Sequence, residues 1–563
     1  PLLSVDTNIT LPKIRDGQSF SIAPLRTAWT LYGSFERNVI STACSVRKIR
    51  KRKQLFPSSV GLVSHTVTPM ICVVVARGRH RQVVAEQNHL AEEGIDLVEL
   101  RIDYINGTPS VKALTTKRTG PVVITCRRER DGGRWSGTED QRLALLRTAI
   151  VEGAEYVDLE EDIAKQVPRF GKTKRIVSYH NFRETPEDVQ AIWERMSECD
   201  PDVIKICTHA NNPHDNLRIL RLVRDAKLPT VGFCMGEMGT MSRILAGRFG
   251  SPWTYAAFSH ESALAPGQLS YEQMTRIYRY DEINAETDVY GVIADPVGHS
   301  LSPQIHNAAF ARERLNKVYV PIRVPGDHLA QFFDDASELG IKGLSVTIPH
   351  KEAVLGLLTD KDEAVEGIGA TNTVVFEGER RRGYNTDYQA AMDSLEIATE
   401  TVGKEKPFEG KTALVLGAGG VGKAIAFGLV LRGARVVLAD GDAGRATELA
   451  QRLKCLSAEW DSRHNVAADI LVNCTPIGMH PNVDVSPFDK HYLRPSMVVF
   501  DAVYNPENTL LVKDAKERNC TVVTGVEMFV RQACLQFEHF TGREGPAQLM
   551  RDVIKRATSA AKA

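Results

Sequence analysis

Short apolar runs alternate with longer amphipathic stretches from Met70 onwards. Eight runs between residues 71 and 258 have the length of a strand: ICVVVA, DLVELRI, PVVITCR, EYVDLE, RIVSYH, DVIKIC, TVGFCM and WTYAAF. The stretches between them, such as QRLALLRTAIVEG, have the apolar spacing of an amphipathic helix. Strands that alternate with helices form a parallel sheet, and eight such units in this length predict a (β/α)₈ barrel over residues 70–281.

Two further α/β regions follow a charged stretch, residues 279–287, which we interpret as a linker. The runs YGVIADPVGHS, GLSVTIPHK and TNTVVF predict strands of a domain over residues 288–397. The segment KTALVLGAGGVGKAIAFGLVLRGARVVLAD has the order strand, glycine turn, helix and strand, which is typical of a dinucleotide-binding unit. We assign residues 408–527 to that unit, and the chain from about Met528 is predicted to be helical.

Residues 1–69 differ from the rest of the chain. They hold no methionine, and residues 47–53 form a dense basic cluster. The cluster is not preceded by the apolar core of a secretory signal. Three interpretations stay open: a poorly ordered tail or linker, a targeting peptide, or the remnant of a preceding domain or of a misplaced start. Our domain division treats the segment as a basic tail or linker, and we assign it no function.

The composition narrows the class of partner. The chain has 563 residues, a formal net charge of +0, 43% hydrophobic and 25% charged residues, which is typical of a globular protein. Neutrality gives no support for binding to nucleic acid or to an anionic membrane, and no apolar run reaches the ~18 residues of a membrane span. Cys72, Cys126 and Cys234 lie inside apolar runs, as expected for reduced cysteines. We therefore predict a cytoplasmic protein that binds small molecules, and its oligomeric state stays open.

Polar residues occur at the C-terminal ends of the predicted barrel strands, where barrel enzymes carry their chemistry. Residues i and i+2 of a strand share a face, so Ile204 and Ile206 are expected to face the helices and Lys205 the opposite side. The other strand-end residues are Glu99, Arg101, Thr125, Arg127, Ser178, His180, Arg243 and Gln268. Each alone has an ordinary explanation, since a strand-end lysine usually extends to solvent. Their convergence on one end of a barrel indicates a site.

Six motifs appear in order between about Met70 and Ile277: VELRID, ITCRRERDGG, VSYHNFRETP, VIKI, GTMSR and APGQLS. With them the chain resembles the type I 3-dehydroquinate dehydratases. The resemblance implies that Lys205 forms a Schiff base with the ketone of 3-dehydroquinate and that His180 acts as general base and acid. A nucleophilic lysine must be neutral, so we expect burial and nearby cations to lower its pKa.

The same resemblance implies roles for further residues of the barrel. Glu99 orients the site, and Asp131 stands next to His180, where the family often has glutamate. Substrate contacts are expected from Arg101, Arg127, Arg243 and Gln268. Asn181 stands where aspartate is expected, and Leu264 stands where the family usually has a serine that contacts the substrate. We expect Leu264 to weaken binding without abolishing activity.

A second set of motifs lies between about Asp288 and the C-terminus: GHSLSPQIHN, VTIPHK, GATNTV, GYNTD, GAGGVG, NCTPIGM and GVEMFVRQA. Here the chain resembles the shikimate dehydrogenases. This implies an α/β substrate domain, completed by C-terminal helices at about 528–560, and a Rossmann-like dinucleotide-binding domain. It also implies that Lys351 and Asp387 are catalytic. A lysine ammonium stabilises the alkoxide that forms when 3-dehydroshikimate is reduced and donates its proton, and a carboxylate holds the ammonium in place.

The resemblance also implies which residues of this second half contact the substrate. They are Ser300, Ser302, Thr347, Asn372, Tyr504 and Gln532. Ser300 and Ser302 are short hydroxyl donors that suit the substrate carboxylate. Relatives that prefer quinate often change this serine motif, so its intact form favours shikimate.

The glycine-rich turn after TALVLG predicts binding of NADP or NAD, because glycines permit a tight turn and a close approach to the pyrophosphate. The expected contacts are Gly417, Ala418, Gly419, Gly420, Gly422, Asn473 and Gly525. NADP is the usual cofactor of the family, whereas Asp440 at the end of the next strand is typical of NAD. Arg445 is a candidate phosphate contact. We keep both cofactors, with the local residues favouring NAD, and expect no metal.

The sequence thus predicts a bifunctional enzyme of aromatic amino-acid biosynthesis that dehydrates 3-dehydroquinate and then reduces 3-dehydroshikimate to shikimate. Three alternatives stay open: a dehydrogenase half that acts on quinate, an inactive homologue that regulates quinate use, and a fragment of a larger multifunctional enzyme. Such regulators tend to lose their catalytic lysines and histidines, whereas Lys205, His180 and Lys351 are all present here.

Overall fold

The structure is a computed structural model that describes residues 69–116, 118 and 120–560. The interpretations of residues 1–69 therefore fall, except for Pro69, outside the described residues. Among the described helices, none combines the length and the apolar composition needed to cross a membrane.

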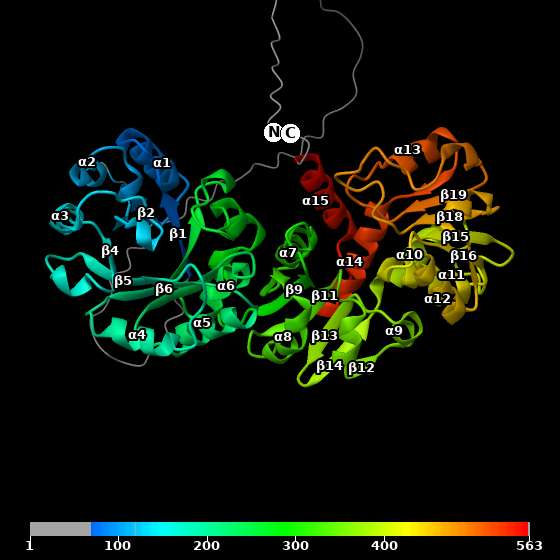
Figure 1. The fold of residues 1–563 in the computed structure, drawn as a ribbon, viewed down its shortest axis with the longest axis horizontal. Coiled ribbons are helices and arrows are strands. Elements are labelled where there is room, and N and C mark those ends of the chain that lie inside the picture. Colours follow the sequence, from blue (N-terminus) through cyan, green and yellow to red (C-terminus); the bar gives the residue numbers. More distant parts are fainter. Residues whose placement is uncertain (1–68, 117, 119, 561–563) are drawn as a thin grey trace, which may run out of the picture. The chain divides into compact units, whose positions relative to one another are not determined.

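Eight parallel strands form the first domain (Figure 1). They are β1 (Met70–Val75), β2 (Leu97–Arg101), β3 (Val122–Thr125), β4 (Tyr156–Glu160), β5 (Lys174–His180), β6 (Val203–His209), β7 (Thr230–Met235) and β8 (Trp253–Ala257). The strand order runs from β7 through β1 to β8, and these two end strands lie against each other, which makes a nearly closed barrel. The predicted barrel is confirmed, and all eight apolar runs form its strands.

Helices between the strands cover the outside of the barrel (Figure 1). They are α1 (His80–Glu92), α2 (Val111–Thr115), α3 (Glu139–Val151), α4 (Val189–Ser197), α5 (His214–Asp225) and α6 (Thr240–Leu245). Where a polar residue caps a helix, that residue determines where the helix begins. Thr138 accepts a hydrogen bond from the backbone of Gln141, whose side chain bonds back to Thr138, so α3 begins with a capping box.

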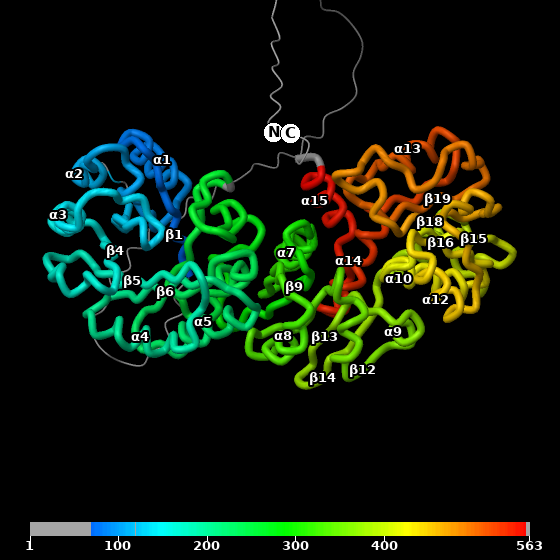
Figure 2. The backbone as a smooth tube through the Cα atoms, in the orientation of Figure 1, coloured from blue at the N-terminus to red at the C-terminus, as the bar shows by residue number. Residues whose placement is uncertain are grey.

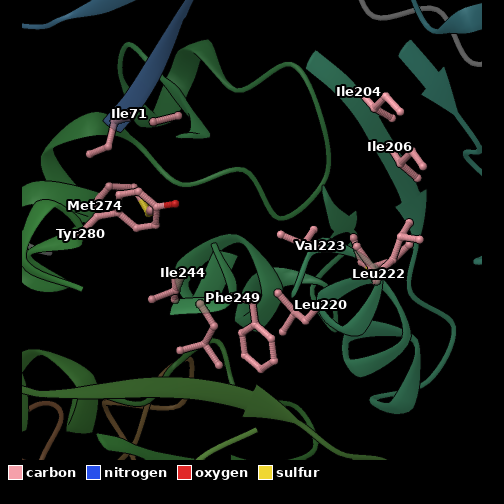
Figure 3. Close-up of a cluster of buried hydrophobic side chains, with 14 of the residues drawn as sticks. Ile71, Ile204, Ile206, Leu220, Leu222, Val223, Ile244, Phe249, Met274 and Tyr280 are labelled. Atoms are coloured by element: carbon pink, nitrogen blue, oxygen red, sulfur yellow. The ribbon is translucent and has the colours of Figure 1, made fainter. Parts of the chain in front are cut away.

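The barrel has an outer and an inner apolar core. Ile204 and Ile206 of β6 and Leu220 and Val223 of α5 (Figure 3) all belong to the core between strands and helices. A separate cluster, including Val203, Cys207, Val231 and Tyr255, fills the lumen. The alternation expected around Lys205 is therefore confirmed for its two isoleucine neighbours. This period of two directs every second side chain of a strand into the lumen.

A mixed six-stranded sheet forms the second domain. Its strands are β9 (Asp288–Ala294), β10 (Lys317–Arg323), β11 (Ile341–Val346), β12 (Asp360–Lys361), β13 (Thr373–Glu377) and β14 (Arg380–Tyr384), and its helices are α7 (Ser302–Arg312), α8 (Leu329–Asp335) and α9 (Glu363–Ile368). The order is β10-β9-β11-β13-β14-β12, with β13 antiparallel to both of its neighbours. The antiparallel hairpin was not part of the sequence prediction.

A parallel six-stranded sheet forms the third domain. Helix α10 (Thr386–Ala398) leads into β15 (Thr412–Leu416), α11 (Gly420–Leu431), β16 (Arg435–Ala439), α12 (Ala443–Leu453), β17 (Leu456–Ser457), β18 (Ile470–Asn473), β19 (Val498–Asp501), α13 (Leu510–Glu517) and β20 (Thr521–Val523). The order β17-β16-β15-β18-β19-β20 is the 3-2-1-4-5-6 order of a Rossmann fold. The dinucleotide-binding fold predicted from the glycine turn is confirmed.

The end of the chain returns to the second domain. Helices α14 (Gly525–Thr541) and α15 (Ala547–Ala560) follow β20, and they pack against α7 and against each other (Figure 2). Phe537 and Ile554, one on each helix, are fully buried with Phe310 of α7. These contacts place α14 beside the loops that hold the candidate substrate residues of the second domain.

The outer core of the barrel can be tested at Ile206, which is 0% exposed. We expect Ile206→Ala to lower the free energy of unfolding by about 2–5 kcal/mol, because truncation removes apolar contacts and leaves a cavity. Val151→Ala, at a position that is 68% exposed on α3, is the matched control and should change little. Thermal unfolding of the full chain measures both, and an Ile206→Ala protein as stable as the control would contradict the assignment of this side chain to the core.

Candidate active sites

One cavity at the C-terminal ends of the barrel strands collects the predicted dehydratase residues. It measures about 80 Å³. Its lining includes Glu99, Arg101, Arg127, Asp131, His180, Lys205, Arg243, Leu264 and Gln268. The strand-end residues of the sequence therefore converge as expected, although they come from six different strands and the loops that follow them.

Lys205 is buried at 4% exposure among negative groups. Its Nζ lies 3.3 Å from Oε1 of Glu99 and 3.1 Å from Oδ2 of Asp158, and it stands 4.0 Å above the ring of Tyr255. Burial disfavours the charged form, but the negative surroundings, Glu99 first, outweigh it and raise the pKa of Lys205 well above its ordinary value. The expected lowering of this pKa is wrong for this structure, because carboxylates and not arginines contact the ammonium.

Two acidic residues of β4 were missed by the sequence prediction. Asp158 and Glu160 both form ion pairs with Arg127, at 2.8 and 3.0 Å. Ser178 donates a hydrogen bond to Asp158 and accepts one from Arg127. The arginine that was expected to repel Lys205 is thus neutralised by its own partners. The sequence did contain a pattern that could have identified them. The polar residues of EYVDLE alternate with apolar ones in the same i, i+2 spacing as Glu99 and Arg101.

His180 is poised to act as a neutral base. Burial, then the positive charges of Arg127 and Lys205, holds the pKa of His180 well below its ordinary value. Among the described residues, Nδ1 of His180 has no hydrogen-bond partner, and its ring stacks on Phe182. Asp131 lines the same cavity, but its carboxylate accepts a hydrogen bond of 2.6 Å from Nε of Arg128.

The two remaining arginines of the cavity differ in whether protein groups already occupy their donors. Arg101 forms a two-pronged ion pair with Asp103. Arg243 is 2% exposed, lies over the ring of Phe233, and its Nε has no partner among the described residues. Burial lowers the pKa of Arg243 to about 10. A buried guanidinium with an unused donor is the strongest candidate here for binding a substrate anion.

The loop after β8 closes one side of this cavity. The backbone N–H of Leu264 donates a hydrogen bond of 2.8 Å to Oε1 of Gln268, so Gln268 holds its own loop. The side chain of Leu264 is partly buried and packs against the apolar cluster of the lumen. It offers the cavity an apolar surface where the family pattern led us to expect a hydroxyl.

A second cavity, of about 420 Å³, collects the predicted reductase residues. Its lining includes Ser300, Ser302, Thr347, Lys351, Asn372, Asp387, Tyr504, Gly525 and Gln532. Nζ of Lys351 donates a hydrogen bond of 2.5 Å to Oδ2 of Asp387, and both side chains are about nine-tenths buried. Ser345 and Gln536 also line this cavity and were missed, although Gln536 lies one helical turn after Gln532.

The turn after β15 fits a dinucleotide pyrophosphate. Gly417 has a φ of +98°, which favours glycine, and a Cβ on Gly422 would lie 1.9 Å from the carbonyl oxygen of Gly417. Helix α11 begins at Gly420, so its free N–H groups face this turn. A Cβ on Gly420 would also lie 3.0 Å from the side chain of Lys351, which puts the turn beside the substrate cavity.

The residues expected to choose the cofactor have different surroundings. Asp440 accepts hydrogen bonds from the backbone N–H groups of Ala418 and Asp442. Arg445, near the start of α12, reaches over the turn to within 3.5 Å of a Cβ built on Gly419. Asn473 is fully buried, and its amide donates to Asp501 and to the backbone of Ile477.

Comparisons with known proteins find relatives for both halves of the chain. Family profiles match for Type I 3-dehydroquinase over residues 71–285, for the Shikimate dehydrogenase substrate binding domain over residues 292–374, and for the Shikimate 5'-dehydrogenase C-terminal domain over residues 525–555. The shikimate dehydrogenase (NADP(+)) of Methanopyrus kandleri is 40% identical over 286 residues, covering 48% of this chain and 96% of that protein. A solved structure of the dehydroquinate dehydratase and shikimate dehydrogenase of S. pombe AroM is 24% identical, with a TM-score of 0.40, covering 87% of this chain and 98% of that chain.

One relative matches nearly the whole chain. The bifunctional 3-dehydroquinate dehydratase/shikimate dehydrogenase of Arabidopsis thaliana, printed as chloroplastic, is 36% identical over 542 residues, covering 90% of this chain and 90% of that protein. Together with the barrel, the Rossmann sheet and the two lysine-centred cavities, this match shows that the chain belongs to the family of bifunctional 3-dehydroquinate dehydratase/shikimate dehydrogenases, which joins a lyase to an oxidoreductase of the shikimate pathway.

Proposed function

We propose that Lys205 is the nucleophile that dehydrates 3-dehydroquinate to 3-dehydroshikimate. The observation that carries this proposal is a lysine at 4% exposure that lines a polar cavity together with a neutral histidine. Nζ attacks the ketone carbon, water leaves, and the resulting iminium withdraws electrons from the neighbouring carbon. His180 accepts the C2 proton and then donates a proton to the departing hydroxyl, which leaves as water. A water molecule then hydrolyses the iminium, which releases 3-dehydroshikimate and frees the amine of Lys205.

Lys205 must lose a proton before it attacks the ketone. Glu99 and Asp158 are the carboxylates in contact with its ammonium, but Asp158 is a poor proton acceptor because its carboxylate stays ionised. Burial opposes ionisation of Asp158, but Arg127 and Lys205 outweigh it and hold the pKa of Asp158 well below its ordinary value. The substrate carboxylate binds Arg243, whose donor is not used within the described residues.

We also propose that the residues of the second cavity reduce 3-dehydroshikimate, the product of the dehydratase, to shikimate. The turn from Gly417 to Gly422 would hold a nicotinamide cofactor, which would supply a hydride for the ketone carbon. Lys351 donates the proton to the carbonyl oxygen, and Asp387 holds the ammonium at 2.5 Å. Ser300 and Ser302 bind the carboxylate, and Thr347 and Asn372 bind the ring hydroxyls. Thr386 already uses one N–H of the Asn372 amide, which leaves the second N–H for a substrate hydroxyl.

The choice between NADP and NAD belongs to this proposal. The Methanopyrus relative is named for NADP(+), as are further shikimate dehydrogenases that resemble this chain. In this chain Asp440 directly follows β16, where its charge repels a 2′-phosphate, while Arg445 is the nearby cation. We propose that the enzyme accepts both cofactors and prefers NAD.

We also propose that the chain divides into domains at residues 70–281, 288–397 and 408–527. We propose that its dehydrogenase half acts on shikimate and not on quinate. A cytoplasmic location stays a prediction, since the Arabidopsis relative is printed as chloroplastic. The inactive-regulator alternative is disfavoured by the pairing of both lysines inside cavities.

Single lysine substitutions should separate the two activities. Lys205→Ala is expected to reduce dehydratase turnover below detection and to leave the reductase unchanged, because it removes the nucleophile of one cavity only. Lys351→Ala should lower reductase kcat by about 10²–10⁴-fold, the range for loss of a general acid, and should spare the dehydratase. Each variant is the folding control of the other. Loss of both activities in Lys205→Ala, or retention of dehydratase activity, would overturn the assignment.

The acid limb of the dehydratase pH profile should lie below the ordinary histidine value of 6.5, because the pKa of His180 is lowered. A neutral base stays available at every pH above its own pKa and is lost as the pH falls through it. Measurement of kcat/KM for 3-dehydroquinate across this range tests the sign, with reductase activity of the same sample as a check on folding. An acid limb with its midpoint above 6.5 would exclude His180 as a base with a lowered pKa.

Cofactor preference should respond to Asp440 and Arg445 in opposite directions. Asp440→Asn removes a charge that repels a 2′-phosphate, so the ratio of kcat/KM for NADPH over NADH should rise by about tenfold, equivalent to about 1.4 kcal/mol. Arg445→Ala should lower that ratio by removing the nearby cation. Steady-state kinetics with both cofactors give the ratios, and an unchanged ratio in both variants would show that other residues make the choice.

A further inference from the structure

A buried tyrosine stands behind the reductase cavity. Tyr319 is on β10, is 0% exposed and does not line the cavity. Its phenol donates a hydrogen bond of 2.6 Å to Oγ of Ser345, and Ser345 donates one of 2.8 Å to Oε1 of Gln536. Ser345 and Gln536 do line the cavity, at 5% and 2% exposure. Tyr319 is therefore the first donor in a chain of hydrogen bonds that leads from the protein interior to residues that line the substrate cavity.

The chain continues to the residue proposed to hold the ring hydroxyls. Nε2 of Gln536 donates to Oγ1 of Thr373 at 3.0 Å and to the carbonyl oxygen of Asn372 at 3.2 Å. Thr373 then donates to Oδ1 of Asn372 at 2.9 Å. Because each group donates to the next, the direction started by Tyr319 determines which end of each amide is the oxygen. Together with the backbone N–H of Thr386, which donates to the same Oδ1 at 2.8 Å, the chain of hydrogen bonds keeps the N–H groups of Asn372 in the orientation that a substrate hydroxyl needs.

The phenol also reaches the opposite end of the substrate. Ser302, proposed to bind the substrate carboxylate, lies close enough to the phenol of Tyr319 to act on its pKa. Burial raises the pKa of Tyr319, with Ser345 and Ser302 opposing the rise, so the phenol stays protonated and remains a donor. The phenol thus lies near the serine at one end of the cavity, and through the side chains of Ser345, Gln536 and Thr373 it reaches the amide of the asparagine at the other.

We propose that Tyr319 is a positioning residue for substrate binding in the reductase. Resting on the proposed reduction of 3-dehydroshikimate, this inference assigns to its phenol the task of holding Ser302 and Asn372 at a fixed separation. The hydrogen bonds that join Tyr319, Ser345 and Gln536 set the spacing of the site. That spacing suits a ring that carries a carboxylate at one end and hydroxyls at the other. Tyr319 touches neither the reacting carbon nor Lys351, so its loss weakens substrate binding and spares the chemical step.

The direct test is Tyr319→Phe in the full chain, which removes one oxygen and keeps the ring. We expect KM for shikimate to rise about tenfold, a change of the size that one lost hydrogen bond to a buried group produces, with kcat nearly unchanged. Tyr290→Phe is the matched control. Tyr290 is 3% exposed on β9, donates to the carbonyl oxygen of Phe540, and does not line the cavity. It should lower thermal stability without raising KM.

Ser345→Ala interrupts the same chain one step later and keeps the test decisive if Tyr319→Phe fails to fold. It should also raise KM, and the double variant should be no worse than the poorer single variant, because both remove one relay. An unchanged KM in either single variant, equal increases in Tyr319→Phe and Tyr290→Phe, or additive effects in the double variant would each overturn the inference. A wild-type chain that is inactive on shikimate would instead overturn the proposed function on which the inference rests.

Discussion

A lysine buried in a protein must be matched by negative charge, and this constraint shapes both halves of the chain. Removing an ammonium ion from water costs several kcal/mol, so a buried lysine persists only beside a carboxylate. Lys205 has Glu99 and Asp158 within 3.3 Å, and Lys351 has Asp387 at 2.5 Å. The elements that bring these charges together are β2, β4 and β6 in the barrel, and the start of α10 for Asp387.

The same pairing serves opposite chemical needs in the two sites. In the proposed reduction Lys351 gives its proton to the substrate oxygen, and one carboxylate, that of Asp387, holds its ammonium in place. Lys205 has to lose its proton to become a nucleophile, yet the structure holds it charged, with its pKa raised. The barrel therefore keeps Lys205 in its ammonium form. In the proposed mechanism, binding of substrate must weaken the interaction of this ammonium with the carboxylates so that Lys205 can lose its proton. His180, neutral through burial and beside this charged cluster, is the group ready to accept a proton.

The periodic pattern of apolar residues predicted the order of strands and helices well, but it did not predict which charged side chains meet or the direction of the Lys205 pKa shift. The eight barrel strands and the Rossmann order follow from apolar runs and a glycine turn, because backbone pairing depends on patterns that are local in sequence. The same i, i+2 rule that selected Glu99 would have selected Asp158, had it been applied to β4. The direction of the Lys205 pKa was wrong, since it depends on how strands far apart in sequence pair their charges. Tyr319 reaches Ser345 across 26 residues, and Ser345 reaches Gln536 across 191, which no local pattern shows.

The central claim is that Lys205 forms a covalent bond with the substrate ketone. Reduction with borohydride in the presence of 3-dehydroquinate converts an iminium into a stable amine, which peptide mass spectrometry can locate on the chain. The account predicts one substrate-derived mass addition, on Lys205, that is absent in Lys205→Ala and unaffected in Lys351→Ala. A mass addition on a different residue, or dehydratase turnover without any trapped adduct, would contradict it.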